Sequence, residues 1–203
     1  AANANAAGTI ALNATVTDAT LTVRAVNFNV TNSTGTQTNF IAANNGAGNN
    51  WNATINTASL SDGTYNITVF ANDTNGNLNS SERVTVTFDN TRPIVFTNNI
   101  SSPTTNGNYS GSNLLLNVSV VDVTLLIQTV FFNITNSTGT QNATFTATKE
   151  GTGNTFSTYL NTTGFRDGTY NVTIRANDTA GNVNNSAIIT ITFDNTAPNV
   201  STI

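Results

Sequence analysis

The strongest constraint on the fold of this chain is that it contains the same sequence twice. Three segments recur in the same order, 104 or 105 residues later: FNVTNSTGTQ at 28–37 as FNITNSTGTQ at 132–141, DGTYNITVFANDTNGN at 62–77 as DGTYNVTIRANDTAGN at 167–182, and VTVTFDNTRP at 84–93 as ITITFDNTAP at 189–198. A fixed period with conserved order is typical of tandem duplication. The sequence therefore predicts two copies of one domain of about 100 residues.

Apolar residues alternate with polar ones inside each repeat, which is the period of a half-buried strand. The alternation is clear in Ile10, Leu12, Ala14 and Val16, and it returns in the segments around Phe28, Trp51, Tyr65 and Val84. Turn-forming pairs such as Asp62-Gly63 and Asn75-Gly76 separate these segments, and no segment has a helical period. The sequence predicts an all-β chain of two tandem antiparallel β-sandwich domains. Phe28, Phe88, Phe132 and Phe193 are the expected core aromatics.

The repeated string Asp62-Gly63-Thr64-Tyr65, with its twin at 167–170, resembles the corner that leads into strand F of immunoglobulin-like (Ig-like) domains. The longer string DGTYNVTIRANDTAGNVN is similar to the bacterial and archaeal Ig-like repeats of surface adhesins, S-layer proteins and extracellular filaments. The resemblance implies two tandem Ig-like sandwiches and tyrosine corners at Tyr65 and Tyr170. The chain departs from antibody domains because it lacks their two Cys and the Trp between them.

Composition excludes most catalytic and nucleic-acid-binding functions. The chain has no His, Cys or Met, and only 8% of its residues are charged, with six Lys plus Arg against ten Asp plus Glu. A Ser-His-Asp triad, a Cys nucleophile and the usual zinc or haem ligands are therefore excluded. Scattered basic residues do not form a phosphate-binding surface, and no apolar run is long enough to span a bilayer. We expect no catalytic residues, no nucleic acid partner and no membrane span.

The acceptor pattern for N-linked glycans, Asn-x-Ser/Thr, is unusually dense. Random placement of 37 Asn among 54 Ser and Thr would give roughly 10 such sites. The chain has 18: Asn13, Asn29, Asn32, Asn52, Asn66, Asn72, Asn79, Asn99, Asn108, Asn117, Asn133, Asn136, Asn142, Asn161, Asn171, Asn177, Asn184 and Asn199.

Two explanations of this excess stay open. In a strand, residues i and i+2 share a face, so an exposed Asn and Thr around one inward residue produce the pattern by themselves, as in Asn29-Val30-Thr31. The sites at Asn32, Asn72, Asn79, Asn177 and Asn184 lie at expected turns or strand ends, where alternation does not apply. We therefore predict dense N-glycosylation, which would solubilise a surface with few charges.

Metal sites are weakly indicated. Asp73-Thr74-Asn75-Gly76-Asn77 is similar to the first half of a calcium loop, but its twin at 178–182 replaces the middle ligand by Ala180, and no downstream Glu completes either loop. We interpret both as turns, and we expect no metal site and no cofactor other than glycans. Asp89-Asn90 and Asp194-Asn195 at the domain exits are too few to indicate calcium.

The two ends of the chain do not match. The second repeat is preceded by Pro93-Ile94-Val95-Phe96, where repeats of this type have their first strand, whereas the first repeat starts with AANANAAG. At the other end, NVSTI follows the second copy of the FDNT segment. We predict a first domain at 1–92 that lacks its own first strand, a second domain at 93–198, and a terminal segment at 199–203 that is a possible donor strand for the next subunit, with Val200 and Ile203 inserted.

The sequence predicts a non-enzymatic structural subunit of a secreted, glycosylated filament, pilus or surface layer, located outside the cell and partnered by copies of itself in a head-to-tail homopolymer. The alternative is an adhesin stalk or cell-surface binding module that belongs to a longer Ig-like array. Strand addition to an open sheet edge would provide the head-to-tail contact.

Overall fold

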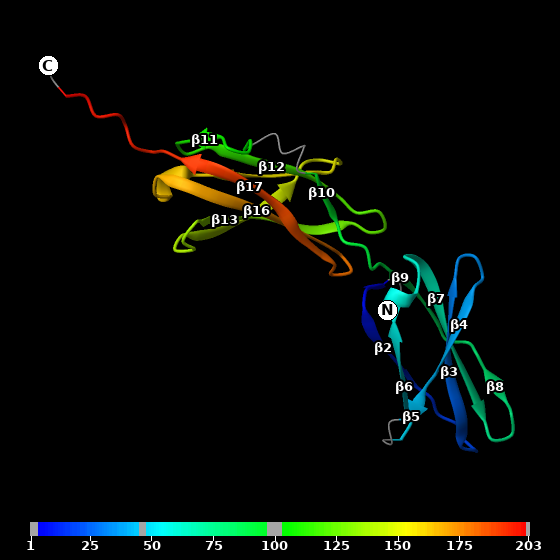
Figure 1. The fold of residues 1–203 in the computed structure, drawn as a ribbon. Coiled ribbons are helices and arrows are strands. Elements are labelled where there is room, and N and C mark those ends of the chain that lie inside the picture. The colour runs from blue at the N-terminus through cyan, green and yellow to red at the C-terminus, as the bar shows by residue number, and fades with distance from the viewer. Residues whose placement is uncertain (1–3, 45–47, 97–102, 202–203) are drawn as a thin grey trace. The chain divides into compact units, whose positions relative to one another are not determined.

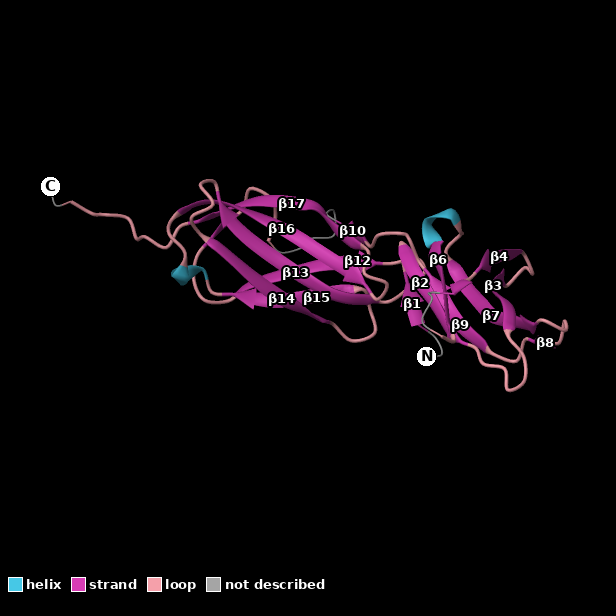
Figure 2. Ribbon diagram, turned by 90° about the horizontal axis from the view of Figure 1, so that it is seen from below, coloured by secondary structure: helices cyan, strands magenta, loops and turns pink. Residues whose placement is uncertain are grey.

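A computed structural model describes residues 4–44, 48–96 and 103–201. The chain divides into two compact units, Ala1–Thr91 (unit 1) and Arg92–Ile203 (unit 2). Both are built almost entirely from strands (Figures 1 and 2). The predicted all-β fold of two tandem sandwiches is confirmed. Among the described residues, no helix has the length and apolar character needed to cross a membrane.

Unit 1 has two facing sheets. One has the order β1-β9-β7-β3-β4, with β8 paired to β7, and the other has the order β2-β6-β5. The strands are β1 (Ala4–Ala6), β2 (Thr9–Thr15), β3 (Val23–Asn32), β4 (Gln37–Ile41), β5 (Ala43–Asn44), β6 (Asn50–Asn56), β7 (Gly63–Asp73), β8 (Leu78–Asn79) and β9 (Arg83–Phe88). A short 3-10 turn, η1 (Thr57–Ser59), follows β6.

Unit 2 repeats this plan with one continuous set of pairings, β10-β12-β15-β14-β13-β16-β17-β11. Its strands are β10 (Ile94–Phe96), β11 (Asn108–Tyr109), β12 (Leu114–Val121), β13 (Ile127–Asn136), β14 (Asn142–Lys149), β15 (Thr155–Leu160), β16 (Gly168–Asp178) and β17 (Val183–Phe193). The 3-10 turn η3 (Thr162–Gly164) matches η1. β14 joins the two layers because it pairs with β13 over most of its length and with β15 at Thr148 and Lys149.

Strand β1 of unit 1, the counterpart of β11 in unit 2, was not apparent in the sequence. Ala4–Ala6 forms β1, which pairs in parallel with the end of β9, as β11 pairs in parallel with the end of β17. All other strand pairs among the described residues are antiparallel. The small side chains of this segment explain why it shows no strand pattern, since the alternation of large apolar residues is the signal that indicates a strand.

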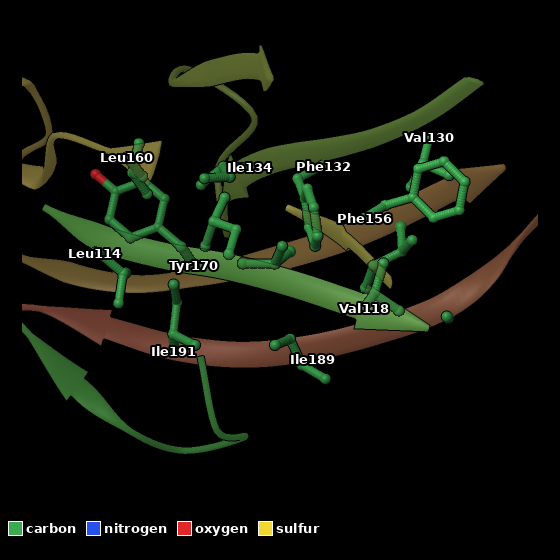
Figure 3. Close-up of a cluster of buried hydrophobic side chains, with 14 of the residues drawn as sticks. Leu114, Val118, Val130, Phe132, Ile134, Phe156, Leu160, Tyr170, Ile189 and Ile191 are labelled. Carbon is green, nitrogen blue, oxygen red and sulfur yellow. The ribbon is translucent and has the colours of Figure 1, made fainter. Parts of the chain in front are cut away.

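The core of each unit lies between its two layers. In unit 2, Phe132, Ile134, Tyr170 and Ile191 point between the sheets and are almost fully buried (Figure 3). The corresponding core of unit 1 is smaller and includes Phe28 and Phe88, which are also buried. Alternating inward residues on facing strands therefore produce both cores, as the period of two predicted.

Candidate functional site

The Asp-Gly-Thr-Tyr corner is the most elaborate polar structure of unit 1. Gly63 has φ of +143°, a backbone conformation that favours glycine, and this lets the chain turn from Asp62 into β7. The Asp62 carboxylate accepts a hydrogen bond from the backbone N–H of Asn90 at 2.7 Å and one from the Thr91 hydroxyl. Asn90 Oδ1 in turn accepts from the Thr57 hydroxyl at 2.7 Å. The corner therefore connects η1, the start of β7 and the chain after β9.

Unit 2 has the same network. The Asp167 carboxylate accepts from the backbone N–H of Asn195 at 2.6 Å and from the Thr196 hydroxyl, and these bonds hold its pKa below the ordinary value. Burial acts to raise the pKa of Asp62, but the hydrogen bonds from Thr91 and Asn90 outweigh it, so that pKa is also lowered. Asp62 and Asp167 therefore stabilise equivalent corners, one in each unit.

The two corner tyrosines lie where the resemblance places them. Tyr65 donates its hydroxyl hydrogen to the carbonyl oxygen of Ser61 at 2.8 Å, and Tyr170 donates to that of Arg166 at 2.9 Å. The Tyr170 ring packs against Phe193 with centroids 4.7 Å apart. Burial raises the pKa of both phenols. This geometry belongs to the support of the fold, since both rings are buried.

In the two turns at 73–77 and 178–182, which are similar to half a calcium loop, the first Asp accepts hydrogen bonds from residues of the same turn. Asp73 Oδ1 accepts from the backbone N–H of Asn75 at 2.8 Å and of Asn77 at 2.9 Å, and Oδ2 accepts from Asn77 Nδ2 at 2.7 Å. The Asn77 hydrogen bonds are the main cause of the lowered pKa of Asp73. Asp178 makes the same bonds to Ala180 and Asn182. Each carboxylate therefore caps a turn.

The Asn-x-Ser/Thr acceptor triplets do not all have the same local structure. At Asn32, Asn79, Asn161 and Asn184, the Asn Oδ1 accepts hydrogen bonds from both the backbone N–H and the hydroxyl of the Ser or Thr two residues later. This is the Asx turn, in which an Asn side chain stabilises a bend. An Asn-x-Ser/Thr triplet at a turn thus has a structural use. It accounts for Asn32, Asn79 and Asn184, three of the sites that strand alternation could not explain. Asn99 lies outside the described residues.

The two units differ at one sheet edge, which is paired in unit 2 and open among the described residues of unit 1. β12 of unit 2 has β15 on one side and β10 on the other. Its counterpart in unit 1, β2, pairs with β6 and with no other strand among the described residues. A groove of about 760 Å³ opens beside β2, between it and the strands β7 and β9 of the facing sheet. Sequence reasoning predicted the unmatched edge, but it could not indicate the groove, which depends on how far the two sheets stand apart.

The terminal segment is exposed. After β17, residues 194–201 form no described strand and extend away from the sheets of unit 2 (Figures 1 and 2). Val200 is 89% exposed, so this apolar side chain has no cover in the single chain. Ile203, the other residue predicted to be inserted, lies outside the described residues.

These features define a class of protein: a tandem pair of β-sandwiches with Ig-like corners, each with one short strand paired in parallel to its last strand. The chain belongs to the bacterial Ig-like domain family, whose family model matches residues 5–90 and 103–195. The predicted resemblance is therefore confirmed. No curated protein matched the sequence.

One solved structure shares the fold of this chain, and two others are similar to it at lower TM-scores. A marsupial T cell receptor superposes with a TM-score of 0.63 at 10% identity, covering 98% of this chain and 74% of the receptor chain. Fibronectin(III)-like modules of Clostridium thermocellum CbhA match with a TM-score of 0.49 at 17% identity, over 96% of this chain and 88% of theirs. A tetra-tandem repeat from the extending region of a large adhesion protein gives 0.41 at 26% identity, over 93% of this chain and 46% of the repeat.

Proposed function

We propose that this chain is a non-catalytic structural unit of a secreted filament, pilus or surface layer. Copies of the chain join head to tail when the terminal segment 199–203 of one copy pairs with the open edge of β2 in the next copy. The bacterial Ig-like family supports a structural module, and repeats of this kind usually lie at the cell surface. A sequence without His or Cys also supports a role in which no catalytic group is required.

The observation that carries this proposal is the difference between the two equivalent edges. β10 occupies the edge of β12 in unit 2, while the matching edge of β2 has no strand among the described residues of unit 1. The chain that leads to β10, FDNTRP, is nearly repeated by FDNTAP at the end of unit 2. An unpaired edge is a template for strand addition. A contact between different surfaces of identical subunits extends into a filament when it does not close.

Glycans on the Asn-rich surface fit the same function. A chain with only 8% charged residues has little else to keep a polymer soluble outside the cell. The test is the mass of proteolytic fragments that cover Asn32 and Asn72 in protein isolated from its native source. Fragments carrying added glycan mass are expected, and unmodified Asn at both positions would contradict dense glycosylation.

The repeat order also supports a second function, that of a stalk in a longer surface protein. In that case the segment after Pro198 is the first strand of a further domain in the same chain, and the sandwiches act as spacers for a binding domain elsewhere. The stalk predicts that residues 1–203 stay monomeric at any accessible concentration. The filament proposal predicts concentration-dependent assembly of the same protein.

Negative-stain microscopy of purified residues 1–203 separates the two functions. Filaments or sheets support the first, and monodisperse monomers support the stalk. The matched variant lacks residues 199–203: we expect it to lose assembly while the thermal unfolding of unit 2 stays unchanged, because these residues are outside its sandwich. Filaments that persist after the deletion would show that strand donation by this segment is wrong.

A further inference from the structure

Resting on the proposed function, we infer that the groove of unit 1 is a built acceptor for one strand, Pro198–Ser201 of a second copy. The strand runs antiparallel to β2 with Val200 opposite Val16. Unit 2 provides the template, because its own β10 lies in the equivalent place. There Val95 pairs with Val120 and Phe96 with Ser119, and Val95 packs against the core.

The repeat gives the register. LNATVTDATL at 12–21 aligns with LNVSVVDVTL at 116–125, so Val16 and Thr15 are the counterparts of Val120 and Ser119. The FDNT segments align Val200 with Val95 and Ser201 with Phe96. Transferring the β10 pairing to unit 1 places Val200 opposite Val16 and Ser201 opposite Thr15. Val200 then points into the groove and Ser201 points to solvent, as alternate residues of a strand must.

The groove is lined by core-type residues without a cover. Val84 of β9 is 41% exposed, whereas its counterpart Ile189 in unit 2 is 7% exposed. Val16 and Ala71 are half-buried, whereas their counterparts Val120 and Ala176 are fully buried. All three unit 1 residues line the groove. In unit 2, β10 is close to both β12 and β17, which accounts for the deeper burial there.

A polar contact marks one end of the acceptor. In unit 2, Asn184 Nδ2 donates to the carbonyl oxygen of Pro93 at 2.8 Å, immediately before β10. Its counterpart Asn79 lies on the groove and is held in the same Asx turn, with Oδ1 accepting from the N–H and hydroxyl of Ser81 at 2.9 and 2.8 Å. Among the described residues, Asn79 Nδ2 has no such acceptor. The counterpart of Pro93 is Pro198, whose carbonyl oxygen would receive this hydrogen bond.

The groove also differs from its template in a way that favours an uncharged strand. Ala187 of unit 2 is buried, and its counterpart on the groove is Glu82, an exposed carboxylate. A charged side chain beside an open edge opposes unspecific strand pairing. The segment 195–203 carries no charged side chain, so it meets this requirement.

The partner is a second copy because of where the chain enters and leaves unit 2. The Asn184–Pro93 bond fixes the entry beside the first residues of β17, whereas the tail leaves after Phe193 at the last residue of β17. Within unit 2 the edge of β12 that would accept such a strand already holds β10. The donor segment therefore leaves a unit at the opposite end from the position where a strand is accepted, and such a contact extends an assembly head to tail.

Disulfide trapping tests the register, since the chain has no native Cys. In the double variant Thr15→Cys plus Ser201→Cys, both positions are exposed, so the units should fold normally. Mild oxidation is expected to give a ladder of disulfide-linked dimers, trimers and longer chains on a non-reducing gel. The matched control is Asn13→Cys plus Ser201→Cys. Asn13 lies on the same face of β2 as Thr15 but two residues out of the predicted register, so this pair should give at most a tenth of the ladder.

A second variant tests the Asn79 contact without a thiol. Asn79→Ala should raise the protein concentration needed for half-maximal assembly by about fivefold, the equivalent of one hydrogen bond. Asn75→Ala, in the neighbouring Asp73 turn and outside the groove lining, should leave that concentration unchanged.

The outcomes separate this inference from the proposed function. Filaments that form in the parent chain but give no ladder with the Thr15–Ser201 pair would overturn the register and leave the filament proposal intact. A disulfide confined to a monomer would overturn the second copy as partner. Absence of both filaments and ladder would overturn the two proposals together, and a ladder specific to the predicted pair would support both.

Discussion

The same substitution at two equivalent positions should have opposite consequences for folding and assembly. Val95 in β10 is part of the unit 2 core, whereas its counterpart Val200 is exposed in the single chain. Replacing either Val by Ala removes two methyl groups, worth roughly 0.8 kcal/mol each when fully buried. Because Val95 is only partly buried and packs against the core from its edge, we expect Val95→Ala to lower the free energy of unfolding of unit 2 by about 1 kcal/mol.

That loss corresponds to a decrease of about 4–8 °C in the unfolding temperature of a domain of this size. Val200→Ala should leave the unfolding temperature of dilute, monomeric protein unchanged, since its side chain contacts solvent. In concentrated protein the proposed assembly reverses the roles: Val200→Ala should raise the concentration needed for assembly about fivefold, because the proposal buries Val200 in the neighbouring copy.

Differential scanning calorimetry at low concentration and sedimentation over a concentration series measure the two effects on the same samples. The reasoning is refuted if Val200→Ala lowers the unfolding temperature as much as Val95→Ala. It is also refuted if Val95→Ala has no effect on unit 2, because β10 would then contribute nothing as a cover and could not serve as a template for the donated strand.

Three further predictions concern the sandwiches themselves. Phe132→Ala should destabilise unit 2 by about 3–5 kcal/mol in urea titrations, because Phe132 is fully buried between the sheets. Tyr170→Phe should cost about 0.5–1.5 kcal/mol, the value of the lost hydrogen bond to Arg166, with little change in the near-ultraviolet contribution of other aromatics. The lowered pKa values of Asp62, Asp73 and Asp167 predict stability that is complete at neutral pH and lost as the pH falls below about 4 through the folded-state values. Thermal unfolding followed from pH 7 to pH 2 should show this decline, and the variant Asp167→Asn should flatten the part due to unit 2.

A chain with only ten Asp and Glu residues would be expected to show a weak dependence of stability on pH. The structure shows, however, that the corner carboxylates and the Asp73 turn are fixed by several donors each. A small number of well-bonded carboxylates is enough to produce acid sensitivity, because each must lose its bonds when it is protonated.

Most of the fold could be predicted from the sequence because its signals are local. Strands such as β2, β3 and β7 alternate large apolar and polar residues, and the Asp62-Gly63 corner has a turn that only glycine tolerates well. β1 was missed because alanine and asparagine give no contrast between faces. The candidate site was predicted only as an unmatched edge, since the groove and the Asn184–Pro93 bond join residues far apart in the sequence.

The Asn-x-Ser/Thr triplets show why one sequence pattern can have several physical causes. Strand alternation produces it at Asn29, an Asx turn produces it at Asn161, and an acceptor for N-linked glycan requires it. Asn184 adds a further constraint, because its Nδ2 already binds the chain before β10. A glycan on that nitrogen would stand between β10 and β17, and the same holds for Asn79 once a donated strand is in place. Strand pairing and glycosylation therefore compete at these two residues, so assembled protein should carry its glycans elsewhere, and fragment masses showing glycan on Asn79 within filaments would contradict the acceptor groove.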